Sequence, residues 1–83
     1  MAYTYKTTGT CSTMIKFDLD GDIVRNVQFM GGCNGNLQGV SRLVEGMKVD
    51  ELEERLKGIS CNGRPTSCPD QLARAVRQAM EEA

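Results

Sequence analysis

The alternation of apolar and polar residues over the first 30 positions predicts three short strands. Residues 3–8 are rich in Thr and Tyr, which favour strands. Two alternating runs follow at 11–19 and 22–30, and Asp20-Gly21 between them is a strong hairpin signal. The apolar residues that the alternation places on the inner side of these two runs are Ile15, Phe17, Leu19, Ile23, Val27 and Phe29. We therefore expect a small antiparallel meander.

The apolar spacing then changes to that of helices. The apolar stripe of the first expected helix consists of Leu37, Val40 and Val44. This helix ends before Gly46, which is a suitable residue to follow a helix end. A second helix is expected over 49–57, where Asp50 and Glu53 have the spacing of a capping box and Gly58 follows the end.

A third helix is expected to begin near Cys68-Pro69, because Pro is favoured in the first turn of a helix. Ser67 and Asp70 also have the spacing of a capping box. The buried face of this helix is predicted to consist of Leu72, Val76, Ala79, Met80 and Ala83. The sequence thus predicts an α+β fold, a small antiparallel meander of about three strands followed by about three helices packed on one face.

The composition narrows the class of protein. A length of 83 residues indicates one domain, spanning residues 1–83. Ten Lys and Arg balance eleven Asp and Glu, which argues against a nucleic-acid-binding surface. No apolar run approaches the roughly 18 residues of a membrane span, and the first residues lack the apolar region of a signal peptide. We therefore expect a cytoplasmic protein with no nucleic-acid or membrane partner.

The four cysteines are the candidate functional residues, because a cytoplasmic protein keeps its thiols reduced and this chain has no histidine. Cys11 begins a strand, Cys33 lies in a Gly-rich loop before a helix, Cys61 lies in a loop, and Cys68 lies in a first helical turn. Helix N-termini favour the thiolate, the form that binds metals. Any one cysteine alone could equally be a small buried apolar residue. All four, however, lie at element ends, which predicts that they meet at one edge of the sheet.

The chain also resembles a known family. Residues 66–70 are Thr-Ser-Cys-Pro-Asp, residues 31–36 are Gly-Gly-Cys-Asn-Gly-Asn, and residues 9–11 are Gly-Thr-Cys. These motifs resemble the TSCPD domain family, in its stand-alone, four-cysteine branch. Related domains occur at the C-termini of class II, cobalamin-dependent ribonucleotide reductases. The resemblance implies a metal-binding or redox accessory role, with such a reductase as the partner.

The order of three cysteines gives a second resemblance, to IscU/NifU-type iron–sulfur scaffold proteins. On that likeness Cys11, Cys33 and Cys68 are the ligands, and Cys61 is a fourth ligand outside the scaffold pattern. The scaffold family has Asp where this chain has Thr13, and His where it has Ser67. A permanent site with Cys61 in place of those ligands is therefore the expectation.

Three functions follow from these residues together with the two resemblances. The first is a binding module in which Cys11, Cys33, Cys61 and Cys68 hold Zn²⁺ or an Fe–S cluster. The second is a dithiol redox carrier for a ribonucleotide reductase, with Cys61 and Cys68 as the pair. The third is an iron–sulfur scaffold or a structural interaction domain. We expect no catalysis by the chain alone, and the sequence leaves open both the native metal and the formation of a homodimer.

Overall fold

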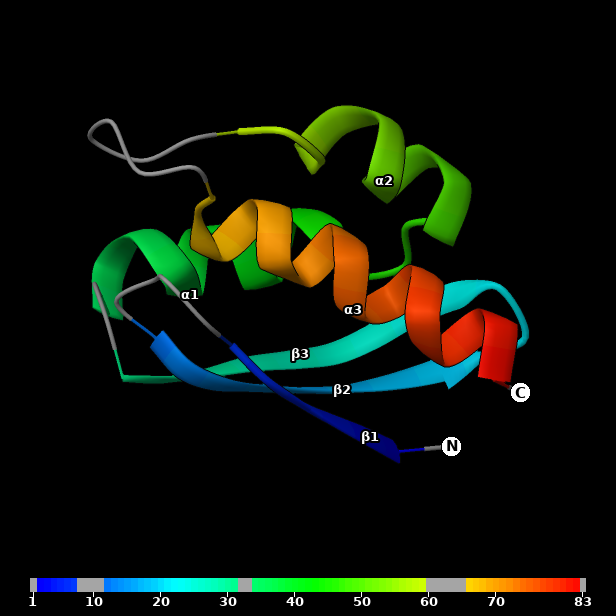
Figure 1. Ribbon diagram of the computed structural model, residues 1–83, viewed down its shortest axis with the longest axis horizontal. Helices are drawn as coiled ribbons and strands as arrows, with labels where there is room; N and C mark the ends of the chain where they lie inside the picture. The colour runs from blue at the N-terminus through cyan, green and yellow to red at the C-terminus, as the bar shows by residue number, and fades with distance from the viewer. Residues whose placement is uncertain (1, 8–11, 32–33, 60–65, 83) are drawn as a thin grey trace.

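The computed structural model describes residues 2–7, 12–31, 34–59 and 66–82. Three strands are followed by three helices (Figure 1), as the sequence predicts for an α+β fold. The elements are β1 Ala2–Lys6, β2 Ser12–Asp20, β3 Ile23–Gly31, α1 Asn34–Val44, α2 Val49–Leu56 and α3 Cys68–Glu82.

The strands form an antiparallel sheet in the order β1-β2-β3. Its inner face is apolar because Ile15, Phe17 and Leu19 alternate with polar residues along β2, and all three are buried. The helices lie on this one face, with α1 against β3, α3 against β2 and α2 against α3 (Figure 1). The predicted arrangement of helices on one side of a meander is therefore confirmed.

A bulge in β3 changes which of its residues enter the core. The register of β2 and β3 shifts between Lys16 and Asp18, and Asn26 adopts a left-handed φ of 56°. The extra residue places Val24 and Val27 on the inner face, three positions apart instead of two. The prediction that Ile23 faces the core was therefore wrong: Val24 is fully buried, whereas Ile23 is half-buried and forms a bridge with Lys48.

The first two helices end before Gly46 and Gly58, as predicted. The start of α2, however, lacks the predicted capping box of Asp50 and Glu53. Gly46 and Gly58 both have positive φ, as a residue after a helix end requires. At the start of α2 the N-cap residue is Lys48, and it makes no side-chain capping bond. The backbone N–H of Val49 instead donates to the carbonyl oxygen of Asp22 at 2.9 Å. The hairpin turn thus accepts the first backbone N–H of the helix.

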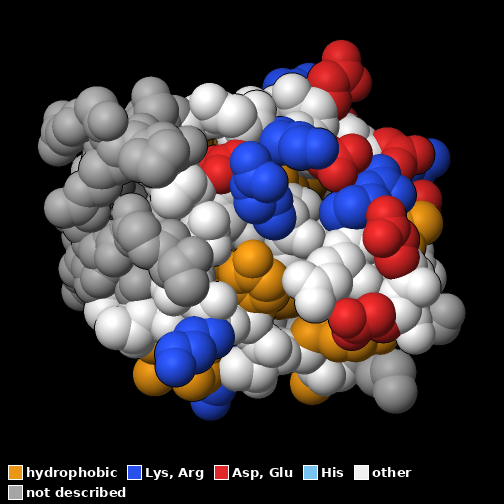
Figure 2. Space-filling view, in the orientation of Figure 1, with side chains coloured by type: hydrophobic (Ala, Val, Ile, Leu, Met, Phe, Trp, Pro, Cys, Tyr) orange, Lys and Arg blue, Asp and Glu red, His pale blue; other side chains and the backbone are white. Residues whose placement is uncertain are grey.

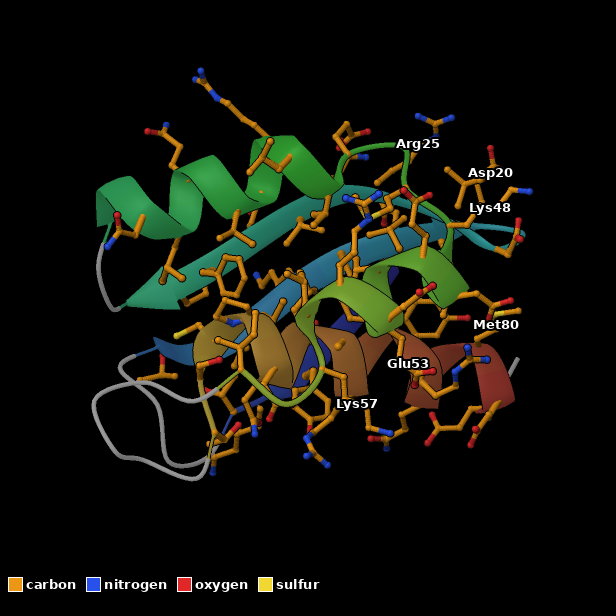
Figure 3. The ribbon with its side chains drawn as sticks, turned by 90° about the horizontal axis from the view of Figure 1, so that it is seen from above. Asp20, Arg25, Lys48, Glu53, Lys57 and Met80 are labelled. Carbon is orange, nitrogen blue, oxygen red and sulfur yellow. The ribbon has the colours of Figure 1, made fainter. Side chains whose placement is uncertain are left out.

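Asp50 and Glu53, predicted as that capping box, connect α2 to α3. Both carboxylates accept hydrogen bonds from the guanidinium of Arg77, with Nε of Arg77 3.2 Å from Oε2 of Glu53. Figure 3 shows Glu53 on the side of α2 that faces α3. Acidic and basic side chains are accordingly interspersed over α2 and α3 on the face seen in Figure 2.

Helix α3 supplies much of the core. Its predicted apolar face is confirmed at Leu72, Val76 and Ala79, which are buried, and Met80 packs half-buried against them. Ala73 and Ala75 are buried as well, and Ala83 lies outside the described residues. Within the described ranges, no helix has both the length and the apolar character that crossing a bilayer requires.

Candidate functional site

One of the four candidate cysteines lies within the described residues. Cys68 is the first residue of α3, as predicted, and it is 8% exposed. Cys11, Cys33 and Cys61 lie outside the described residues. The meeting of the four sulfur atoms therefore stays a prediction.

The element ends that adjoin these cysteines do lie together. Ser12, which follows Cys11, pairs across the sheet with Gly31, which precedes Cys33 by two residues. Figures 1 and 3 show the start of β2, the end of β3, the start of α1 and the start of α3 at the same end of the molecule. The hairpin with Asp20 and Arg25 lies at the opposite end (Figure 3).

Ser67 caps the N-terminus of α3 immediately before Cys68. Its Oγ accepts a hydrogen bond from the backbone N–H of Asp70 at 3.2 Å, as a capping serine does. The same hydroxyl donates to the carbonyl oxygen of Ile59 at 2.6 Å. The predicted capping by Ser67 is confirmed, and it also ties the chain after α2 to the start of α3.

The other half of the predicted capping box, the side chain of Asp70, has a different role. This carboxylate is fully buried, and three donors reach it from three parts of the chain. The backbone N–H of Gly58 donates to Oδ1 at 2.7 Å. The hydroxyl of Thr66 and Nε of Arg74, the latter at 3.0 Å, both donate to Oδ2. Gln71 in turn donates to the hydroxyl oxygen of Thr66 at 2.9 Å.

These donors decide the charge of Asp70. Burial raises the pKa of its carboxyl, but the hydrogen bonds from Gly58, Thr66 and Arg74, together with the charge of Arg74, outweigh burial. The net pKa lies below the ordinary value of 3.8. The site therefore contains a buried carboxylate with three hydrogen-bond donors, two residues after Cys68.

Sequence reasoning treated Asp70 only as a capping residue. A further signal was present, because Thr66, Asp70 and Arg74 recur at spacings of four residues. That spacing places the Asp70 carboxylate, an acceptor, between the donors Thr66 and Arg74 along one side of the helix start. The hydrogen bond from Gly58 could not be predicted from neighbouring residues, because it depends on how the end of α2 packs near α3.

Other metal ligands are not grouped within the described part of the chain. Among residues 2–7, 12–31, 34–59 and 66–82, no three His, Cys, Asp or Glu side chains lie close enough together to hold a metal ion. Asp70 is occupied by its three donors. Of the described residues, Cys68 is therefore the candidate ligand.

Comparison with protein-family models matches residues 2–80 to the TSCPD domain. The chain belongs to the TSCPD domain family. Comparison with curated proteins and with solved structures gives no match. The likenesses of this TSCPD domain to reductase C-terminal domains and to IscU/NifU scaffolds therefore stay predictions.

The five residues that spell the family motif have separable tasks in this TSCPD domain. Thr66, Ser67 and Asp70 hold the helix start through hydrogen bonds, and Pro69 occupies the first turn. Cys68 is the motif residue that carries a thiol, and it is buried. The motif is thus a framework of polar contacts around one buried thiol at a helix N-terminus.

Proposed function

We propose that this TSCPD domain is a metal-binding accessory module in which Cys11, Cys33, Cys61 and Cys68 hold one Zn²⁺ ion or one iron–sulfur cluster. The observation that carries this proposal is the gathering of element ends at one end of the molecule (Figure 1). The ends of β2, β3, α1 and α3 that meet there adjoin three of the cysteines in sequence.

The donor set favours zinc or iron–sulfur chemistry. Four thiolates and no histidine match a Cys₄ zinc site, with Zn–S bonds of about 2.3 Å, or the thiolate ligation of a cluster. Cys68 stands at the start of α3, in a turn that the hydrogen bond from Asp70 N–H to Ser67 Oγ holds in place.

The burial of Cys68 favours a ligand over a dithiol carrier. A carrier would use Cys61 and Cys68 as its pair, and the attacking thiol must reach a sulfur atom on another protein. Reactive cysteines of that kind are partly exposed. Cys68 is only 8% exposed and stands in a turn held by Ser67 and Asp70. Its position suits a bound ion better than an encounter with a large partner.

We test the metal proposal with protein purified without oxygen. Elemental analysis should give close to one zinc per chain, or iron with inorganic sulfide and visible absorption. Each of the four Cys→Ser variants should lose most of the metal. Met30→Ser is the matched control, because it removes a sulfur atom from β3 near its end without removing a thiol. A reduced wild-type chain that stays folded and binds neither zinc nor iron would refute the proposal.

The accessory role links the module to ribonucleotide reduction. The likeness of its cysteine motifs to C-terminal domains of class II ribonucleotide reductases supports this link. Binding of the metal-loaded domain to a cobalamin-dependent reductase should be measurable by calorimetry and should weaken in the Cys68→Ser variant. If neither the wild-type domain nor the Cys68→Ser variant binds the reductase, the reductase is not the partner.

A further inference from the structure

We propose that the open edge of β3 and the neighbouring side of α1 form a docking groove for an extended segment of another protein. The segment adds to the sheet beside β3 and places an acidic side chain against Arg42. The residues that form this groove, within 27–31 and 37–42, include none of the four cysteines. The groove is therefore an interaction site separate from the proposed metal site.

β3 is an edge strand, and the chain itself covers only the first part of that edge. The sheet order β1-β2-β3 leaves one side of β3 outside the three-stranded ladder. The backbone N–H of Val24 donates to the carbonyl oxygen of Met47 at 2.9 Å, and the carbonyl oxygen of Val24 accepts the N–H of Gly46 at 2.8 Å. From Val27 to Gly31, in contrast, β3 pairs with β2 alone among the residues that the structure describes.

The backbone of Phe29 points to this open edge. Because Val24 bonds away from β2, its partner Leu19 bonds toward β1. Backbone groups of successive strand residues point to opposite sides, so Lys16, three residues before Leu19, bonds toward β3. Its partner Gln28 therefore bonds toward β2. Phe29 follows Gln28 and thus presents its N–H and its carbonyl oxygen to an incoming strand.

The open part of the edge carries none of the features that prevent strand addition. Exposed edges are usually protected by charged side chains or by proline. The edge sequence Val-Gln-Phe-Met-Gly at 27–31 contains neither, and Met30 is 43% exposed. The opposite edge of the sheet, β1, ends with an exposed lysine, Lys6. The β3 edge is therefore the side of the sheet that is suited to accept a further strand.

The shape beside the edge fits one strand better than a second copy of the domain. A groove of about 400 Å³ lies between β3 and α1, and its lining includes Val27, Phe29, Leu37, Gln38 and Arg42. Figure 3 shows α1 along the outer side of β3, away from β2. A single extended segment can share this space with α1. Two copies paired through their β3 edges would bring both α1 helices into the same space.

The groove lining specifies the chemistry of the segment. Val27 and Leu37 are each 6% exposed and give the groove an apolar floor, which favours apolar side chains at alternate positions. Arg42 is exposed, and within the described ranges its guanidinium forms no ion pair. An acidic side chain on the segment supplies the missing partner. Backbone hydrogen bonds along Phe29 give affinity, and these side-chain contacts give specificity.

The test uses the full reduced chain, in the metal state in which it purifies, and the fluorescein-labelled peptide Glu-Thr-Val-Thr-Val-Thr-Glu. Its valines and glutamates share one face, and the pattern reads the same from both ends. Wild type should bind it saturably by anisotropy, and Arg42→Glu should weaken binding about 10-fold or more. Arg42→Glu should instead prefer Lys-Thr-Val-Thr-Val-Thr-Lys, because the charge pair is restored. Arg55→Glu, which reverses a charge on α2, should bind the first peptide within about 3-fold of wild type.

A second pair of variants tests the backbone contact. Phe29→Pro removes the N–H that points to the open edge and leaves the bonds of Gln28 to β2 in place, so it should weaken binding about 10-fold. Phe29→Val keeps the N–H and an apolar side chain and should bind within about 3-fold of wild type. With wild-type protein, a peptide that carries N-methyl groups on its central Val-Thr-Val amides should not bind. The Phe29 N–H should exchange with solvent more slowly in the complex.

The outcomes separate the possible occupants of the edge. The absence of saturable binding by wild type, or equal affinity for the peptide and its N-methyl form, would overturn the proposal. If Phe29→Pro fails to fold, the N-methyl peptide still tests the backbone contact. If wild type alone sediments as a dimer that Phe29→Pro converts to a monomer, a second copy occupies the edge, and the proposal is overturned in that way too.

Discussion

Replacing Leu52 by Ala should release α2 from the rest of the domain. α2 has eight residues, and a helix that short has little stability of its own in water. Its buried residues are Val49 and Leu52, and both are 0% exposed within the core formed by the sheet and α3. Leu52 is therefore one of the two fully buried side chains of α2, and Leu56 packs half-buried against the same core.

The size of the effect follows from that burial. Leu52→Ala removes three carbon atoms, which contribute about 0.8 kcal/mol each by transfer from water, or about 2.4 kcal/mol. A residual cavity adds to this loss, and buried Leu→Ala replacements cost about 2–5 kcal/mol in total. We expect about 3 kcal/mol, against a total stability of roughly 4–12 kcal/mol for a domain of this length.

Urea unfolding followed by circular dichroism, with both proteins in the same metal state, measures this difference. At about 4–8 °C per kcal/mol, the thermal midpoint should fall by about 12–24 °C. Leu43→Ala is the matched control, because Leu43 lies on α1 and is 78% exposed. It should change stability by less than about 0.5 kcal/mol. A cost below about 1 kcal/mol for Leu52→Ala would contradict this role of Leu52 in the core.

Three further predictions concern the metal, the buried carboxylate and the bulge. Removing the metal by chelation should lower the thermal midpoint of the reduced protein by tens of degrees, because a Cys₄ site contributes on the order of 10 kcal/mol to folding; an unchanged midpoint would contradict a structural site. The lowered pKa of Asp70 adds stability that is fully present above its ordinary pKa of 3.8 and is lost as pH falls through the folded-state value. The difference in unfolding free energy between wild type and Asp70→Asn should therefore shrink below about pH 4 in urea titrations, and a difference that grows on acidification would be inconsistent with it. Asn26→Ala should cost about 1–2 kcal/mol, because Asn26 has a φ of 56° that alanine tolerates poorly, and Asn26→Gly should cost less; equal costs would remove backbone strain as the cause.

Features set by neighbouring residues were predictable from the sequence. The hairpin at Asp20-Gly21 formed as expected, with Gly21 at a φ of 63° and Asp20 paired with Ile23. Gly46 and Gly58 marked two helix ends because few other residues adopt their backbone conformation at low cost. In each case the residues that predict the feature are the same few residues that form it.

Features that depend on a distant part of the chain were not predictable. The bulge at Asn26 is held by Glu45, which accepts its backbone N–H at 2.8 Å, and by Asp18, which accepts its side-chain amide at 2.8 Å. Without knowledge of those two partners, a regular strand with strictly alternating apolar and polar residues was the better expectation for β3. The start of α2 was likewise assigned a side-chain cap, because nothing local indicates that the carbonyl of Asp22 accepts the N–H of Val49.

The family motif combines both kinds of information. Capping α3 requires only the hydroxyl of Ser67, which sequence reasoning identified. The bonds from Gly58 and Thr66 to Asp70 add nothing to the helix ladder, but they join the exit from α2 to the first turn of α3. Gly58 lies 12 residues before Asp70, so its bond depends on how the two helices pack, and the motif residues alone could not predict it.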